Sequence, residues 1–232
     1  MEIGGLQKSS MIDYPGKISC VIFLSGCNFT CPYCHNPALV NGRLSERPSL
    51  APEEVFTFLS VRRDFLEGVV ISGGEPTLQA DLPEFCADIK AMGYPVKLDT
   101  NGSRPAVLEH LIASGLVDGI AMDIKTAPSG YSPRIHPSIR SEPILASIRH
   151  IMTSGLPHEF RTTCVRPLVD EAILARICRR IQGADRYVLQ QFRDAEVLDP
   201  AFFEEAPRRF TDAEIEALRR RCAPWVQECI VR

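Results

Sequence analysis

The sequence contains no long apolar segment, and no run approaches the roughly 20 consecutive apolar residues of a membrane-spanning helix. It also begins without a positively charged start followed by an apolar stretch, so we expect a cytoplasmic protein with no membrane association. Neither sign of charge dominates, because 26 Lys and Arg stand against 29 Asp and Glu, a net charge of −3. This balance offers no electrostatic surface for nucleic acid or an anionic membrane.

Internal repeats and low-complexity tracts are also absent, which excludes solenoids and disordered linkers. The 232 residues are 45% hydrophobic and 24% charged, ordinary values for a globular protein. A chain of this length can bury one substantial core. We therefore expect one domain over residues 1–232, with residues 1–17 as an N-terminal extension.

Short apolar runs alternate with amphipathic stretches from residue 18 nearly to the end of the chain. Strands are expected at 18–24, 69–71, 96–98, 119–122, 159–165 and 187–191, and helices at 50–66, 81–92, 104–114, 141–153, 170–182 and 211–221. Strands that alternate with helices pair in parallel through right-handed crossovers. The pattern predicts an α/β fold, either a partial (β/α)₆ barrel with parallel strands or a doubly wound open sheet.

The cysteines are many and odd in number, nine in all, which in a cytosolic protein points to metal binding or catalysis rather than disulfides. Cys27, Cys31 and Cys34 follow the first expected strand with the spacing C-x₃-C-x₂-C. Three thiolates from one loop can hold three irons of a [4Fe–4S] cluster and leave the fourth iron without a protein ligand. An open metal position is where an added ligand can bind and react.

Four other interpretations of this loop remain. Cys31-Pro-Tyr-Cys34 alone resembles a glutaredoxin-like dithiol, although that leaves Cys27 without a role. With His35 it matches a c-type haem attachment site, which usually implies export. The three cysteines and His35 could also hold a structural zinc ion. Finally, the three cysteines could be small packing residues. This is improbable, because three cysteines fall within eight residues and stand beside Gly, Pro and Asn.

The other cysteines do not repeat this spacing, so the sequence predicts no second cluster. Most of them lie inside apolar periodic segments, and we interpret them as packing residues: Cys20, Cys86, Cys164, Cys178, Cys222 and Cys229.

Unusual residues follow the second, third and fourth expected strands, and one more lies on the fifth. Parallel strands place their carboxyl ends on one rim of the sheet. The residues concerned are Gly73, Gly74 and Glu75, then Asp99, then Asp123 and Lys125, and finally Arg161. Two glycines let the backbone approach a ligand closely, and a glutamate can accept a hydrogen bond from an ammonium group. Such a rim suits a zwitterionic amino acid, with Lys or Arg facing its carboxylate.

These motifs together resemble the radical S-adenosylmethionine (SAM) superfamily. Within it the chain is most similar to activating enzymes of glycyl radical enzymes, especially the short form that acts on anaerobic ribonucleoside-triphosphate reductase. The resemblance covers nearly the whole chain, through Asp13-Tyr-Pro-Gly16, Phe23-Leu-Ser-Gly-Cys-Asn28, Cys31-Pro-Tyr-Cys-His-Asn-Pro37, Gly73-Gly-Glu-Pro76, Asp99-Thr-Asn-Gly102 and Asp123-Ile-Lys125.

The resemblance implies specific roles. Cys27, Cys31 and Cys34 would hold one [4Fe–4S] cluster, with Tyr33 and His35 beside the cofactor. Gly73, Gly74 and Glu75 would receive the methionine ammonium group of SAM, and Lys125 with Arg161 its carboxylate. Asp99 and Asp123 would help to bind a monovalent cation. Pyruvate formate-lyase activating enzymes also carry a late histidine near the cofactor, whereas this chain has Leu-Gln-Gln-Phe-Arg at 189–193.

The implied activity is that of an anaerobic oxidoreductase that reductively cleaves SAM to a 5′-deoxyadenosyl radical. The radical would install a glycyl radical on a partner enzyme such as anaerobic ribonucleoside-triphosphate reductase, and a flavodoxin or ferredoxin would supply the electron. The alternative is a radical SAM enzyme that acts on a small molecule, similar to 7-carboxy-7-deazaguanine synthase.

Overall fold

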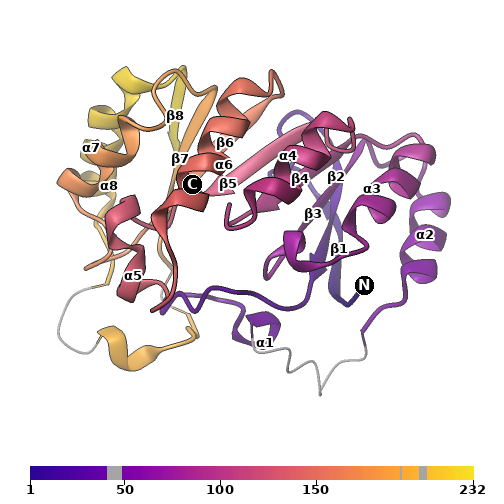
Figure 1. The fold of residues 1–232 in the computed structure, drawn as a ribbon, viewed down its shortest axis with the longest axis horizontal. Helices are drawn as coiled ribbons and strands as arrows, with labels where there is room; N and C mark the ends of the chain where they lie inside the picture. Colours follow the sequence, from indigo (N-terminus) through magenta and orange to yellow (C-terminus); the bar gives the residue numbers. More distant parts are fainter. Residues whose placement is uncertain (41–48, 194, 204–207) are drawn as a thin grey trace. The chain divides into compact units, whose positions relative to one another are not determined.

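The chain divides into two compact units in the computed structural model, which describes residues 1–40, 49–193, 195–203 and 208–232 (Figure 1). The first unit comprises Met1–Asn28, Ala38–Thr100 and Ala106–Ile120, and the second comprises Phe29–Pro37, Asn101–Pro105 and Ala121–Arg232. Each unit is thus assembled from segments that are far apart in the sequence. The expectation of a single domain over 1–232 stays a prediction.

Four strands organise the first unit: β1 (Ile3–Ser10), β2 (Ser19–Leu24), β3 (Gly68–Gly73) and β4 (Val96–Thr100). The pairs β2–β3 and β3–β4 are parallel, as predicted, whereas β1 is antiparallel to β2. The strand β1 was not predicted, and it lies within the expected N-terminal extension. Its segment IGGLQKSS contains two glycines and exposed polar residues, so it lacks the apolar signature of a buried strand.

Helices of the first unit lie beside its strands. The helices α2 (Pro52–Val61) and α3 (Leu82–Ala91) contact each other through Phe56 and Phe85, whose ring centroids are 5.4 Å apart (Figure 1). The unit also contains the 3₁₀ turn η1 (Pro76–Leu78), while α1 (Pro37–Val40), α4 (Pro105–Ala113) and β5 (Gly119–Asp123) lie where the chain passes between the units.

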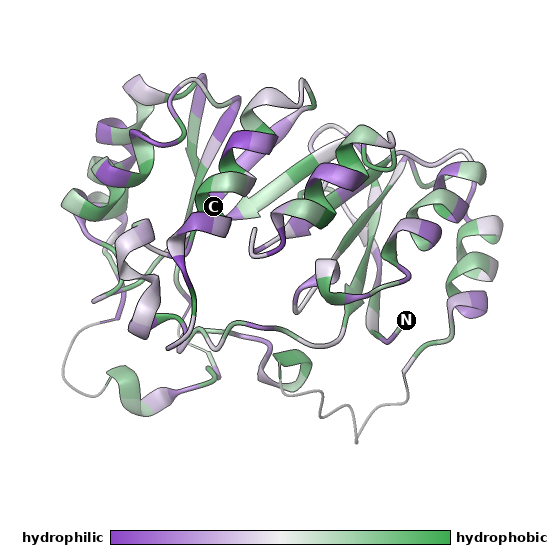
Figure 2. Cartoon of the chain, viewed as in Figure 1, coloured by the Kyte–Doolittle hydropathy of each residue, from purple (hydrophilic) through white to green (hydrophobic). Residues whose placement is uncertain are grey.

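The core of the first unit follows from its sequence pattern. Val69, Val70 and Ile71 of β3 are fully buried, as expected for a parallel strand covered on both faces. On α3 the buried residues are Leu82, Phe85, Cys86 and Ile89, a spacing that places them on one face of the helix. Figure 2 shows the result, with hydrophobic strands and helices that carry hydrophobic and hydrophilic bands.

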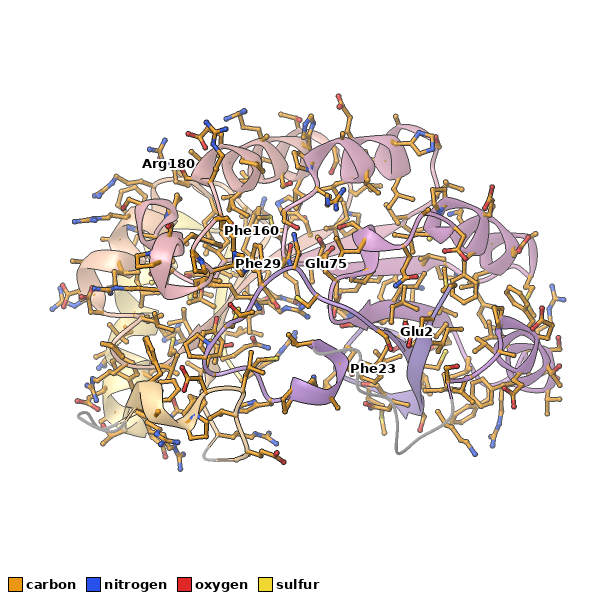
Figure 3. The ribbon with its side chains drawn as sticks, turned by 60° about the horizontal axis from the view of Figure 1, so that its bottom comes forward. Glu2, Phe23, Phe29, Glu75, Phe160 and Arg180 are labelled. Carbon is orange, nitrogen blue, oxygen red and sulfur yellow. The ribbon has the colours of Figure 1, made fainter. Side chains whose placement is uncertain are left out.

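The second unit contains the parallel strands β6 (His158–Cys164), β7 (Arg186–Gln191) and β8 (Glu228–Val231). Its helical segments are η2 (Pro128–Gly130), α5 (Tyr131–Arg134), α6 (Ser141–Thr153), α7 (Glu171–Cys178), η3 (Pro200–Phe203), α8 (Asp212–Cys222) and η4 (Ala223–Trp225). On β6 the side chain of Phe160 is buried, whereas Arg180 after α7 points outward (Figure 3). The four-residue strand β8 was not expected, because so short a segment carries little periodicity.

All six predicted strands occur within a few residues of their expected positions, as β2 to β7, and the six predicted helices occur as α2, α3, α4, α6, α7 and α8. The longest discrepancy is the helix expected over 50–66, which ends at Val61. Within the described residues, no helix is both long and apolar enough to cross a membrane.

Candidate active site

The carboxyl ends of β2 and β3 lie side by side, because the strands are parallel and paired in register along their whole length. Beyond them, the Gly74 N–H donates to the Leu24 carbonyl and the Glu75 N–H donates to the Gly26 carbonyl, each over 2.8 Å. A Cβ atom at Gly74 would lie only 2.1 Å from the Gly26 oxygen, so the approach requires glycine. The turn after β3 therefore positions the backbone just before Cys27.

The Glu75 side chain is fully buried in the first unit (Figure 3). Its Oε1 accepts hydrogen bonds from the Thr77 N–H at 3.1 Å, the Thr77 hydroxyl at 2.5 Å and the Thr100 hydroxyl at 2.7 Å. The carboxylate thus connects the turn after β3 to the end of β4. Neither threonine was predicted to belong to the site, although Thr77 follows Glu75 closely enough to suggest a local cap.

Asp99 lies on β4 and forms a buried ion pair. Its Oδ1 is 2.5 Å from the Nζ of Lys97, and the two side chains are 7% and 3% exposed. Residues two apart on a strand share one face, which places both side chains on the same side of β4. The charge of Asp99 is therefore balanced within its own strand.

The rest of the cysteine loop, residues 29–37, belongs to the second unit and is held by backbone hydrogen bonds. The Leu198 N–H donates to the Cys34 carbonyl and the Asp199 N–H donates to the Pro32 carbonyl, each over 3.0 Å. Within the loop the Cys34 N–H donates to the Cys31 carbonyl over 3.0 Å. These contacts fix the backbone that carries the last two thiols of the motif.

Tyr131 is a second support for this loop that the sequence analysis missed. Its ring packs edge-on against Phe29, with centroids 6.0 Å apart, and its hydroxyl accepts from the Lys125 N–H over 3.0 Å. The residue is fully buried although it lies in a Pro- and Ser-rich segment, where periodicity gives no sign of core packing.

Asp123, Lys125 and Arg161 form one charged group in the second unit. The Asp123 carboxylate accepts from Lys125 Nζ at 2.8 Å and from Arg161 Nε at 2.7 Å. Burial favours the neutral carboxyl, but Arg161 and Lys125 outweigh it and hold the pKa of Asp123 below its ordinary value. Burial likewise favours neutral Lys125, yet Asp123 raises the pKa of this ammonium group well above its ordinary value. All three groups are therefore charged at neutral pH.

Tyr33 of the cysteine loop lies near the charged group of Asp123, Lys125 and Arg161. Its side chain is buried and interacts electrostatically with Lys125 and Cys31. Burial raises the pKa of the Tyr33 phenol well above its ordinary value, so the phenol keeps its proton. In the described part of the chain its hydroxyl has no hydrogen-bond partner, which is unusual for a buried donor.

His35 contacts the end of β7. Its ring stacks on Phe192, with centroids 5.2 Å apart and an angle of 25°, and its Nε2 lies 3.1 Å from the Arg193 carbonyl oxygen. The sequence analysis assigned no role to Phe192. Its position directly after the sixth predicted strand could have indicated a place near the site, because parallel strands present their carboxyl ends on one rim.

The residues of the cysteine loop fit the iron–sulfur cluster that the motif implies. Cys27, Cys31 and Cys34 form no disulfide, and thiolates are the usual ligands of such clusters. The unpartnered Tyr33 hydroxyl beside Cys31 offers a hydrogen-bond donor to a polar ligand. Over residues 1–40, 49–193, 195–203 and 208–232, no three His, Cys, Asp or Glu side chains are already grouped as a metal site.

The predicted site residues fall into two sets, one in each unit. The first unit holds Cys27, Gly73, Gly74, Glu75 and Asp99, and the second holds Cys31, Tyr33, Cys34, His35, Asp123, Lys125 and Arg161. In the first unit, backbone hydrogen bonds connect the turn at residues 73–75 with the start of the cysteine loop. In the second unit, ion pairs connect Asp123 with Lys125 and Arg161. The roles of these residues toward a cofactor stay predictions.

Known proteins provide an independent comparison. The family model of the Radical SAM superfamily matches residues 21–177. A candidate glycyl-radical enzyme activating enzyme of Methanocaldococcus jannaschii is 38% identical over 205 residues, covering 86% of this chain and 83% of that protein. The pyruvate formate-lyase-activating enzyme of Streptococcus mutans is 31% identical over 183 residues, covering 72% of this chain and 66% of the enzyme.

Solved structures agree on the fold. SuiB of Streptococcus suis, in its crystal structure bound to S-adenosylmethionine, matches 90% of this chain with a TM-score of 0.69 at 14% identity. The matched region is 49% of SuiB, so this chain spans about half the length of that protein. The predicted fold class, α/β with parallel strands of the radical SAM type, is confirmed. Since the family implies the cluster and SAM, the chain is an enzyme of the radical SAM superfamily, on the branch that holds the glycyl-radical-enzyme activating enzymes.

Proposed function

We propose that this protein activates a glycyl radical enzyme by abstracting a hydrogen atom from a glycine of that partner. The observation that carries the proposal is the 38% identity over 86% of this chain to a candidate activating enzyme. Intact C-x₃-C-x₂-C and Gly-Gly-Glu motifs support it as well, because they supply the ligands and the close backbone approach that radical SAM chemistry requires.

In this proposal Cys27, Cys31 and Cys34 hold the [4Fe–4S] cluster as thiolates. When bound, the cluster and SAM supply a one-electron cleavage of the sulfonium that yields methionine and a 5′-deoxyadenosyl radical. The chain orients this chemistry and protects it from water. Its backbone hydrogen bonds from Gly74 and Glu75 position the start of the cysteine loop, and those from Leu198 and Asp199 position its end.

In this proposal, negatively and positively charged groups of the chain bind the amino-acid end of SAM. Gly73, Gly74 and Glu75 would face its ammonium group, and Lys125 with Arg161 would face its carboxylate. Both cations already bind Asp123, at 2.8 and 2.7 Å, so a substrate carboxylate would share or compete for them. Tyr33 and His35 would lie beside the cofactor. A monovalent cation at Asp99 and Asp123 would add to the charge balance of these carboxylates.

The partner proposed for this activity is anaerobic ribonucleoside-triphosphate reductase, with a flavodoxin or ferredoxin as electron donor, in the cytoplasm. The proposal rests on the resemblance of the motifs to the short activating enzymes and on relatives of the activating branch.

The test is anaerobic incubation of the reconstituted, reduced enzyme with SAM and a candidate glycyl radical protein. We expect release of 5′-deoxyadenosine and a glycyl EPR doublet on the partner. The variant Cys31→Ala should abolish both signals, whereas Cys86→Ala, which changes a buried cysteine outside the motif, should preserve them.

Two results would contradict the proposal differently. Release of 5′-deoxyadenosine without a glycyl signal on any partner would favour an enzyme that acts on a small molecule. If the reconstituted protein releases no 5′-deoxyadenosine under strong reductant, radical SAM catalysis itself is excluded.

A further inference from the structure

Three cysteines outside the motif meet in the second unit. Cys178 ends α7, Cys222 ends α8 and Cys229 lies on β8, and all three are free and buried, at 1%, 3% and 7% exposure. The Cys222 side chain interacts electrostatically with both Cys178 and Cys229.

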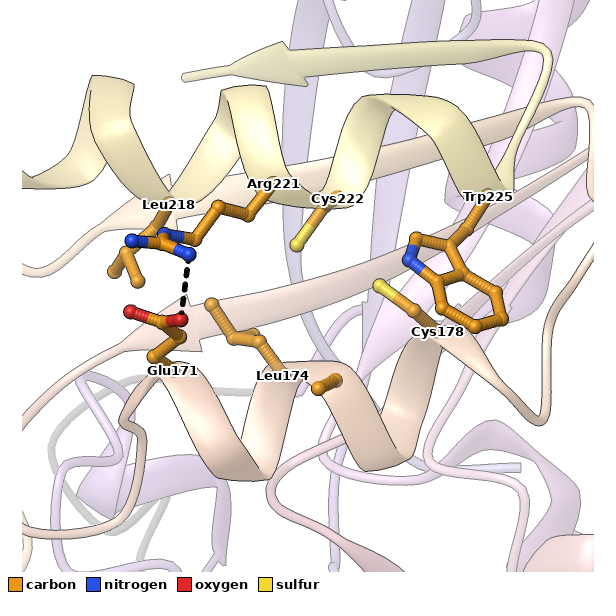
Figure 4. Close-up of a pocket in the computed structure, with 8 residues that line it drawn as sticks. Glu171, Leu174, Cys178, Leu218, Arg221, Cys222 and Trp225 are labelled. Carbon is orange, nitrogen blue, oxygen red and sulfur yellow. Dashed lines mark ion pairs between the residues drawn. The ribbon is translucent and has the colours of Figure 1, made fainter.

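A cavity of about 260 Å³ lies against two of these thiols, between α7 and α8. Figure 4 shows the side chains of Cys178 and Cys222, from the two helices, among the residues that line it, with Leu174, Leu218 and Trp225. The cavity therefore provides space beside both buried thiols.

The mouth of the cavity carries an ion pair. Arg221 and Glu171, which also line the cavity, are 2.8 Å apart and their side chains are 65% and 57% exposed. A surface pair of this kind is weak and rearranges readily. Its exposure places this part of the cavity lining at the surface.

Their interaction also distinguishes the thiols chemically. The interaction with Cys222 lowers the pKa of the Cys178 and Cys229 thiols, and the same interaction raises the pKa of Cys222. Of the two thiols that line the cavity, Cys178 therefore ionises before Cys222 and is the better nucleophile. Burial instead raises the pKa of Cys20 and of Cys86 in the first unit to about 12.

Two buried thiols that line the same cavity suit thiol–disulfide exchange. We propose that Cys178 and Cys222 form a reversible dithiol–disulfide site that reacts with small-molecule disulfides entering the cavity between α7 and α8. This inference is independent of the proposed function.

The reaction balances in two steps. The Cys178 thiolate attacks one sulfur of the small disulfide, forms a mixed disulfide and releases one thiolate. Cys222 then loses its proton to solvent and attacks the Cys178 sulfur, which forms the Cys178–Cys222 disulfide and releases the second thiolate. The protein dithiol is oxidised by two electrons and the small disulfide is reduced to two thiols.

The experiment treats the anaerobic, cluster-loaded enzyme with 4,4′-dithiodipyridine and maps its peptides without reduction. We expect a linked pair of peptides carrying Cys178 and Cys222, release of about two thiopyridones per chain, and reversal by dithiothreitol. Iron content and circular dichroism check that the enzyme stays loaded and folded. If Cys178 and Cys222 both remain free thiols in the folded enzyme, the proposal is wrong.

Variants assign the roles. Cys222→Ser should leave Cys178 as a stable mixed disulfide, and Cys178→Ser should prevent linkage and leave Cys222 unmodified. Cys229→Ser is the matched control, since it removes the third thiol and should leave the linked peptide in place. Equal modification of Cys20 or Cys86 in the wild type would show general exposure of thiols and would overturn the proposal.

Discussion

Gly74 illustrates how one missing side chain shapes the candidate site. Its backbone passes so close to Gly26 that a Cβ would lie 2.1 Å from the carbonyl oxygen and 3.2 Å from the Cys27 nitrogen. Neither contact partner is a side chain that could rotate away. The backbone before Cys27 and the turn after β3 can therefore hold their hydrogen bonds only while residue 74 is glycine.

We predict that Gly74→Ala lowers the free energy of unfolding by about 1–3 kcal/mol, the usual cost of forcing an extra carbon into a packed site. Gly5→Ala is the matched control, because its Cβ would meet Phe23 at an ordinary 3.9 Å and should change stability by less than about 0.5 kcal/mol. Urea unfolding of both variants tests this expectation. Equal stability of the two variants would contradict it.

The charged group around Asp123 makes a second prediction at this scale. Asp123→Asn removes the negative charge between Lys125 and Arg161, and we expect a loss of about 2 kcal/mol, typical of hydrogen bonds to charged groups. Glu142→Gln, in an exposed pair with Arg140 at 3.9 Å, should change stability very little.

The pH dependence of this loss follows from the lowered pKa of Asp123. Its stabilising contribution is complete above the unfolded carboxyl pKa of about 3.9 and is lost as pH falls toward the lower folded value. The difference between wild type and Asp123→Asn should therefore stay constant from about pH 8 to about pH 5. Urea unfolding across this range measures it, and a difference that shrinks near neutral pH would show that Asp123 is not held ionised.

At the scale of elements, α7 shows how local sequence starts a helix that carries a thiol. Asp170 caps it, because its Oδ1 accepts from the Ile173 N–H over 2.7 Å. Leu174, Ile177 and Cys178 form its buried face. The cap and the buried spacing are both local signals, which is why the sequence predicts this helix well.

We predict that Asp170→Ala destabilises the protein by about 1 kcal/mol through loss of this cap. Asp170→Asn keeps an acceptor oxygen at the same place and should retain most of the stability. Thermal or urea unfolding distinguishes the two. Similar losses in both variants would indicate that the charge of Asp170, rather than its hydrogen bond, stabilises α7.

For the whole molecule, the distribution of cysteines makes the cluster prediction specific. Three of the nine belong to the loop motif, while the others are buried in strands and helices of both units. The motif cysteines lie in a loop whose backbone accepts hydrogen bonds from Leu198 and Asp199. We therefore predict one cluster per chain.

Anaerobic reconstitution should accordingly bind about four irons per chain. Cys27→Ser, Cys31→Ser and Cys34→Ser should each lose most of this iron, while Cys20→Ser and Cys164→Ser should retain it. Iron analysis with EPR of the reduced cluster provides the measurement. Wild-type protein that takes up zinc or haem instead would refute the cluster assignment.

Residues of the predicted rim form two hydrogen-bonded groups, one in each unit, and the rim itself stays a prediction. Parallel pairing of β2 and β3 explains why Gly74 and Glu75 bond the residues before Cys27, and this could be anticipated from the strand pattern. The burial of Glu75 under Thr77 and Thr100 could not, because it depends on the register of β4 and on a 3₁₀ turn.

The sequence by itself determined the six βα units and the cysteine loop, because periodicity, caps and short spacings are properties of neighbouring residues. The tertiary structure alone decided that Asp123 binds both Lys125 and Arg161, that Phe192 stacks on His35, and that Cys178 meets Cys222 beside a cavity. Contacts such as Asp123 with Arg161 or Cys178 with Cys222 join residues far apart in the chain. They depend on strand register and helix packing, which local patterns do not encode.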